Sequence, residues 1–138
     1  MREIKFRGKP TENNTSYIEE GVFVYGSLIV CDGKYYIALN VNDNIKRDDY
    51  EVYMIEVIPE TVEQYTGLKD KNGKEIYEGD IIKVRAYLSG YINAEVYFKD
   101  GKFAFDGSNY NFKDLNNKVE VISNIYDNPE LLGGNNGD

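Results

Sequence analysis

The residues best suited to acid and base chemistry are Glu78 and Asp80, which flank Gly79 directly before the apolar pair Ile81-Ile82. In a strand both carboxylates would point to the same face, where such a pair can share general acid and general base roles. A structural role is simpler: Gly79 allows a turn, and Asp80 accepts hydrogen bonds from the backbone amides of that turn. We therefore predict no catalytic residue here.

A second acidic segment, Asp70-Lys-Asn-Gly-Lys-Glu75, carries alternating oxygen ligands of the kind that calcium binds. An EF-hand loop that began at Asp70 would need Gly at its sixth position and Glu at its twelfth, but those positions are Glu75 and Ile81. The segment is therefore predicted to be a hairpin loop. No metal site and no cofactor are expected.

The chain contains no histidine, which restricts its chemistry further. His-based triads, Cys-His pairs and zinc sites with imidazole ligands are excluded, and Cys31, the only cysteine, can form no internal disulfide. A single cysteine suits a reducing compartment. The N-terminus lacks an apolar signal core, and no apolar run approaches the roughly 20 residues of a membrane-spanning helix. We predict a cytoplasmic protein that is not an enzyme and makes no membrane contact.

Tyrosine is abundant, with 13 residues, and Tyr87 and Tyr91 lie close in sequence to Lys83 and Arg85. Aromatic rings among basic side chains can stack on bases and bind phosphates. Tyrosine is also a common strand residue and is enriched at protein interfaces, and these two interpretations are favoured here. The pattern assigns no binding residue.

Net charge argues against nucleic acid as a partner, because a chain of net charge −8 repels a phosphate backbone. Nucleic-acid binding would gain support only if the dispersed basic residues converged on one face. These residues are Arg2, Lys5, Arg7, Lys83 and Arg85. The stretch 43–63 is strongly acidic, and it reads either as a solvated face or as a surface for a basic partner.

Strand signals dominate the 138 residues, a length typical of one domain. Asp32-Gly33, Asn72-Gly73 and Asp100-Gly101 each separate two strand-like runs, which predicts three antiparallel hairpins with positive φ at the turn residues. A period of two predicts one buried sheet face, because Val96, Phe98, Phe103 and Phe105 alternate with Glu95, Tyr97, Lys99, Lys102 and Ala104. Residues 35–39 contain no charge and no proline, so they form either an unprotected sheet edge that pairs with a second copy or a central strand.

The predicted fold is all-β, built from antiparallel hairpins. Residues 1–58 are expected to form an N-terminal β part, residues 59–132 a small SH3-like barrel, and residues 133–138 a disordered tail. The order of elements from Gly79-Asp80 onward favours the barrel: short strands, a tight hairpin, a single helical turn and a last strand. This is fold-level pattern matching and carries no function.

One long run, residues 58–82, resembles the signature of the YopX-like proteins carried by phages and prophages of Gram-positive bacteria. Residues 1–9 and 123–132 resemble the opening and the close of that family. The resemblance implies an all-β fold with a small barrel in the C-terminal half, and it implies no activity. Two positions depart from the family pattern: Phe23 stands where Trp is usual, and Glu63 where Gly is usual.

Composition and resemblance together predict a protein that acts by binding, without catalysis. Its partner is expected to be an unidentified protein or further copies of itself. The alternative is a nucleic-acid-binding barrel module that uses Lys83, Arg85 and the neighbouring tyrosines.

Overall fold

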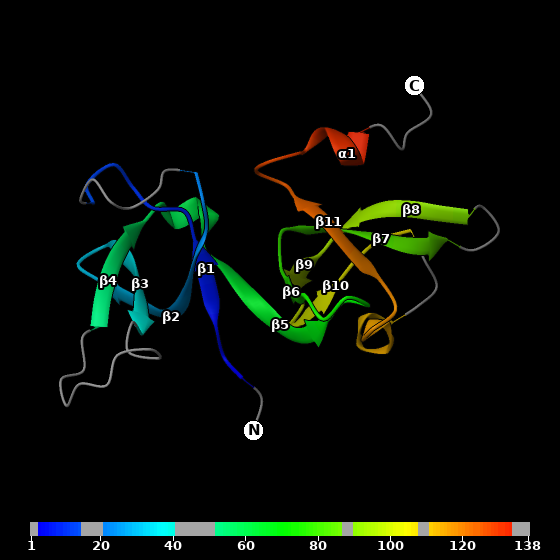
Figure 1. Cartoon of the computed structure of the whole chain (residues 1–138), viewed down its shortest axis with the longest axis horizontal. Helices are drawn as coiled ribbons and strands as arrows, with labels where there is room; N and C mark the ends of the chain where they lie inside the picture. The colour runs from blue at the N-terminus through cyan, green and yellow to red at the C-terminus, as the bar shows by residue number, and fades with distance from the viewer. Residues whose placement is uncertain (1–2, 15–20, 41–51, 87–89, 108–110, 134–138) are drawn as a thin grey trace. The chain divides into compact units, whose positions relative to one another are not determined.

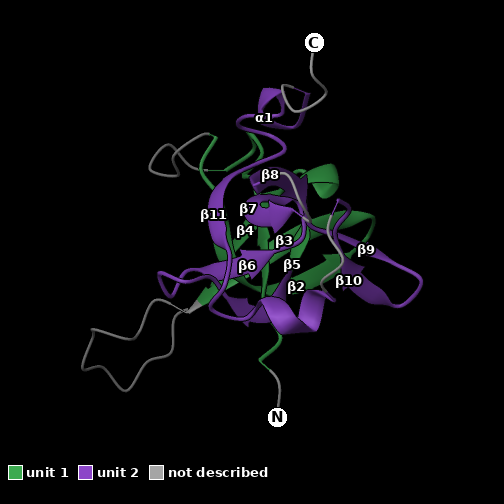
Figure 2. Cartoon of the chain, turned by 90° about the vertical axis from the view of Figure 1, so that its right-hand side faces the viewer, with its two compact units in different colours: residues 1–64 green, residues 65–138 purple. Residues whose placement is uncertain are grey.

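The structure is a computed structural model that describes residues 3–14, 21–40, 52–86, 90–107 and 111–133. They belong to two compact units, residues 1–64 and 65–138 (Figure 2). Antiparallel strands dominate both units (Figure 1), which confirms the all-β prediction. The described helices are short: η2 (Pro59–Thr61), η3 (Phe112–Leu115) and α1 (Glu130–Gly133). Of the predicted tail 133–138, residues 134–138 lie outside the described part of the chain.

The N-terminal unit contains β1 (Phe6–Gly8), β2 (Val24–Cys31), β3 (Lys34–Asn40) and β4 (Val52–Val57), paired in the order β4-β3-β2-β1. A bridge between Pro10 and Val57 joins the chain after β1 back to β4. It is flanked by hydrogen bonds from the Thr11 amide to the Glu56 carbonyl, 2.9 Å, and from the Ile58 amide to the Lys9 carbonyl, 2.8 Å. Both ends of the strand order are therefore tied together in this unit.

β5 (Glu63–Lys69) begins in the first unit, where Glu63 lies opposite Arg7 on β1. Its later residues belong to the second unit and pair with β6 (Glu75–Tyr77), with Tyr65 opposite Tyr77. From the sequence we predicted the boundary between the two parts of the chain before Pro59. The unit division falls after Gln64 because the first residues of β5 pair with β1.

β3 lies in the interior of its sheet, with β2 on one side and β4 on the other. Ile37 at its centre is fully buried, opposite Leu28 on β2 and Ile55 on β4. The interpretation of residues 35–39 as a sheet edge is therefore wrong, and the central-strand interpretation is confirmed. The strand needs no charged protection because its own neighbours satisfy its backbone.

Two of the three predicted turns have positive φ at both residues: Asp32 and Gly33 at 54° and 73°, Asp100 and Gly101 at 55° and 80°. This is the geometry of a two-residue type I′ hairpin. The third turn also joins antiparallel strands, but of Asn72 and Gly73 only Gly73 has positive φ, at 82°. Our expectation of positive φ at both residues was wrong there because the loop is longer.

The C-terminal unit is built around β7 (Asp80–Ala86), which lies between β8 (Gly90–Glu95) and β11 (Glu120–Asn124). β9 (Tyr97–Lys99) and β10 (Lys102–Ala104) form a separate hairpin. Strands, loops and η3 all contribute to the core: Ile76, Ile82, Val84, Ala94, Val96, Phe105, Leu115, Val119 and Val121. The pairings among the described residues do not close into a barrel.

The predicted apolar stripe of the β9–β10 hairpin is buried at one end only. Val96 and Phe105 are buried, whereas Phe98 is 51% exposed. Phe98 packs edge-on against Phe103, its direct partner across the hairpin, with ring centroids 5.0 Å apart. Alternation therefore identified the correct face, but the core does not reach the tip of the hairpin.

Candidate functional site

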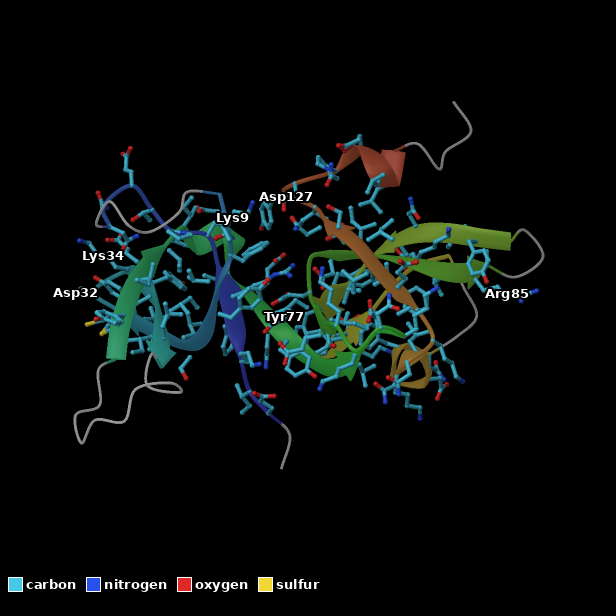
Figure 3. All side chains as sticks on the ribbon, in the orientation of Figure 1. Lys9, Asp32, Lys34, Tyr77, Arg85 and Asp127 are labelled. Atoms are coloured by element: carbon cyan, nitrogen blue, oxygen red, sulfur yellow. The ribbon has the colours of Figure 1, made fainter. Side chains whose placement is uncertain are left out.

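Three of the sequence-predicted nucleic-acid residues, Lys83, Arg85 and Tyr91, lie together on the β7–β8 pair. Tyr91 lies directly opposite Arg85, and the Lys83 ammonium lies 5.4 Å from the centroid of the Tyr91 ring. Lys83 and Arg85 are two residues apart on one strand, so they share a sheet face, and both are exposed (Figure 3 labels Arg85). The fourth residue, Tyr87, lies outside the described residues. We call Lys83, Arg85 and Tyr91 the β7–β8 strip.

Acidic residues border the strip at one end. Glu120 on β11 lies opposite Lys83, and its carboxylate lies 3.7 Å from the Lys71 ammonium. Glu95 shares the face of Tyr91 on β8, further along the strand, and burial raises the pKa of its carboxyl group. The strip therefore carries positive charge at the Arg85–Tyr91 end and loses it toward Glu95.

Of the basic candidates near the N-terminus, the structure describes Lys5 and Arg7, and both are paired with acids. The buried Arg7 donates to Glu63 Oε1 from Nε at 2.9 Å and from Nη2 at 2.8 Å. Lys5 forms an ion pair with Glu3 at 3.3 Å. Arg2 lies outside the described residues. Arg7 is thus structural, and Lys5 and Arg7, the two candidates that the structure describes in this unit, each contact an acidic residue.

Arg7 is also covered by an aromatic ring. The centre of its guanidinium group lies 4.2 Å from the centroid of Phe23, and the Lys9 ammonium lies 5.0 Å from the same ring. Both departures from the family pattern, Phe23 and Glu63, therefore contact Arg7. Glu63 is buried, so the interpretation of stretch 43–63 as a continuous solvated face is wrong at that residue, and residues 43–51 lie outside the described part.

Asp70 organises the hairpin loop 70–75, the segment that the sequence analysis rejected as a calcium site. Its buried carboxylate accepts hydrogen bonds from the amides of Asn72 and Lys74, both at 2.8 Å, and from the amide of Val121 at 3.0 Å. Burial raises the pKa of Asp70, but these hydrogen bonds outweigh burial and hold it below its ordinary value. The carboxylate is thus occupied by backbone donors, as a loop anchor requires.

The Glu78 and Asp80 pair is likewise structural in its geometry. Gly79 has φ of 82° in the turn before β7, and the Asp80 carboxylate accepts the amide of Tyr77 at 2.8 Å. Asp80 is buried, whereas Glu78 lies in the turn and is half-buried. The expected hydrogen bond, which Asp80 accepts from a backbone amide, is confirmed. The strand alternation that would pair the two carboxylates does not apply, because Glu78 precedes the strand.

The outer side of the N-terminal sheet carries an apolar surface. Strand alternation places Tyr25, Ile29, Tyr36, Ala38 and Met54 on the face opposite Ile37 and Ile55. We call these five residues the apolar face. Tyr25 is 45% exposed and Met54 48% exposed, while the other three are half-buried. The available signal was that both alternating sets of side chains in β3 are apolar.

Other kinds of site find no support in the described residues. No cluster of three or more metal-binding side chains occurs among them. None of their helices is long and apolar enough to cross a membrane. Cys31 is exposed and unpaired at the end of β2.

Comparison with known proteins identifies the family of this chain. The sequence pattern of the family described as "YopX protein" matches residues 5–133. The chain belongs to the YopX family. Protein EF1440 from Enterococcus faecalis, a crystal structure, is similar at 26% identity, with 96% of this chain and 99% of that chain covered and a TM-score of 0.49. A search of curated proteins finds no match. The family resemblance predicted from residues 58–82 is confirmed.

Proposed function

We propose that this YopX family protein is a phage- or prophage-encoded binding module that works in the cytoplasm of its bacterial host without catalysis. Its partner is a protein, either another chain or a second copy of itself. The apolar face of the N-terminal sheet is the observation that supports this proposal. A solvent-facing side of an antiparallel sheet normally alternates to polar residues, whereas this one holds three aliphatic or thioether side chains and two tyrosines.

The register of the strands makes the apolar face continuous. Ser27, Ala38 and Met54 lie opposite one another across β2, β3 and β4, and Ile29 lies opposite Tyr36 in the next row. Tyrosine and methionine are enriched at protein interfaces because they bury large area while adapting to a partner. The one charged side chain in these two rows is Glu56, which lies at the β4 edge. Such a surface favours a protein partner over a polyanion.

The buried acidic residues support the absence of catalysis in this proposal. A general acid or base must reach a substrate proton, and its pKa is usually moved toward the working pH. Asp70 instead has a lowered pKa, and its oxygens are taken by three backbone amides. Asp80 is buried against the Tyr77 amide. Both carboxylates therefore have structural roles, as acceptors for backbone amides.

We also propose that the C-terminal unit has SH3-like barrel topology. The order of its elements supports this: β5 to β8, the β9–β10 hairpin, the 3-10 turn η3 and the last strand β11. A single core shared by β6, β7, β8, β11 and η3 is consistent with it. The topology itself assigns no partner.

Sedimentation velocity at micromolar concentration tests self-association, comparing wild type with the double variant Tyr25→Lys/Met54→Lys. Both positions are exposed at the apolar face, so the variant should fold, and its loss of association would support the proposal. If wild type is a strict monomer, pull-downs from infected host cells compare the same two baits with a Phe98→Lys bait. A partner lost only with the apolar-face variant supports the proposal. Equal capture by all three baits would overturn it.

A nucleic-acid-binding module is the second candidate, and one observation favours it: the β7–β8 strip brings an exposed tyrosine and two exposed cations together. This arrangement resembles the aromatic and basic surfaces that bind single strands. The net charge of −8 opposes it.

A further inference from the structure

The structure of the β7–β8 strip favours one class of nucleic acid over the others. We propose that the strip binds single-stranded nucleic acid, with one base stacked on Tyr91 and the phosphates on either side held by Lys83 and Arg85. The inference rests on the second candidate function and names its site and ligand class.

Tyr91 has the exposure that a stacking platform requires. At 63% exposed, it has the largest exposed fraction among the big apolar side chains of the described residues. Its ring is not buried by the core of the C-terminal unit, so a base can approach it. The Lys83 ammonium at 5.4 Å from the ring centroid lies within the range of a cation–π contact and helps to hold the ring in place. The stacking surface and a phosphate-binding cation are therefore adjacent.

Lys83 is available for a phosphate. Glu120, the residue opposite Lys83 on β11, forms an ion pair with Lys71. No ion pair of Lys83 is found among the described residues. Arg85 lies opposite Tyr91 on the adjacent strand and provides a second exposed cation next to it. Two exposed cations on the strand beside one exposed ring can contact the two phosphates that flank a stacked base.

The same residues explain why a single strand is preferred to a duplex. A base can stack on a side chain only when it is free of its neighbours, as in single strands and loops. A duplex presents a higher density of phosphate charge, which a chain of net charge −8 repels more strongly. Glu95, on the same face of β8 as Tyr91 and opposite Ile81, opposes phosphate contacts beyond Lys83. The predicted footprint is therefore short.

Fluorescence anisotropy tests the proposal with labelled oligo-dT and oligo-U of about 12 nucleotides, within the usual range of single-strand site sizes, and with a duplex of the same length. We expect both single strands to bind and the duplex not to bind measurably. With two phosphate contacts, log K should fall with log salt at a slope of about −1.4. Stronger binding of oligo-U would identify RNA, through its 2′-hydroxyls, as the favoured strand.

Variants assign the site. Tyr91→Ala should weaken binding by about ten- to a hundredfold, as expected for one lost base stack. Phe98→Ala removes another exposed ring, on the β9–β10 hairpin, and should have no effect. Lys83→Gln should reduce the salt slope by about 0.7. The matched control Lys102→Gln, on the β9–β10 hairpin, makes the same change in net charge and should leave the slope unchanged. Thermal melts establish that each variant is folded.

Each failure has a distinct meaning. No binding of any oligonucleotide would overturn both the site and the nucleic-acid candidate function. Binding that survives Tyr91→Ala, or that Lys83→Gln and Lys102→Gln weaken equally, would overturn the site while leaving the candidate function standing. Preference for the duplex would overturn the single-strand assignment.

Discussion

The carboxylate of Asp70 accepts a hydrogen bond from the backbone amide of Val121, 51 residues away in sequence, at 3.0 Å. Its other oxygen accepts the amides of Asn72 and Lys74 within its own loop. One buried side chain thus fixes the local turn and attaches it to the last strand, β11. A second tie supports the same junction, because the amide of Lys71 donates to the carbonyl of Val119 at 2.8 Å.

We expect Asp70→Ala to lower the free energy of unfolding by about 2 kcal/mol or more, because three buried amides lose their acceptor. Asp70→Asn should also destabilise, since its NH₂ group would face a donor. Urea unfolding gives the measurement. Asp114→Asn, an exposed carboxylate in η3, is the control and should stay within about 0.5 kcal/mol of wild type. Equal stability of Asp70→Ala and wild type would show that water replaces the carboxylate.

Stability should depend on pH through the same residue. The pKa of Asp70 is lowered on folding below its ordinary value of 3.8, so its contribution is present above that value and is lost as pH falls through the folded pKa. Wild type should therefore lose stability below about pH 4 more steeply than Asp70→Asn. Thermal melts across this acidic range measure the difference. Parallel curves for the two proteins would argue that other carboxylates control acid unfolding.

Gly79→Val should lower the free energy of unfolding by more than about 1 kcal/mol, because Gly79 has φ of 82° and a β-branched residue is strained there. The position cannot relax easily, since its amide donates to Val96 and its carbonyl accepts from Ile125, at 2.7 and 2.9 Å. Gly133→Ala, in α1 with no atom near its added Cβ, is the matched control. An unchanged melting temperature for Gly79→Val would mean that the turn tolerates another conformation.

Gly26→Ala should destabilise the N-terminal unit for a different reason. A Cβ at Gly26 would lie 2.1 Å from the carbonyl oxygen of Ala38 on β3, so the strands must separate to admit it. Overpacking of this kind typically costs about 1–3 kcal/mol. Chemical denaturation, with the Gly133→Ala variant again as reference, measures the loss. Wild-type stability would indicate that β2 and β3 can move apart without cost.

Arg7→Met should be strongly destabilising, by about 3–5 kcal/mol, because it removes the positive charge that offsets the buried Glu63 carboxylate. The double variant Arg7→Met/Glu63→Leu should recover much of that loss, since neither charge then remains buried. A double-mutant cycle in urea provides the coupling energy. Additive effects of the two single variants would contradict the importance of the pair.

Local chemistry was readable from the sequence at the turns. Asp32-Gly33 and Asp100-Gly101 adopt positive φ because the two-residue hairpin depends only on adjacent residues. The turn role of Gly79 and the amide contact of Asp80 follow from the same local logic. Asn72-Gly73 departs from it because Asp70, outside the dipeptide, sets the conformation of the loop.

Tertiary structure alone decided which strand is an edge, which acid is buried and which aromatic residues remain exposed. Residues 35–39 became a central strand because β2 and β4 pair with both sides, and Glu63 became a buried partner because the register places it opposite Arg7. Phe98 and Tyr91 stay exposed although alternation or strand propensity would bury them. Residue order determines which side chains share a face, but the pairing of distant segments determines whether anything covers that face.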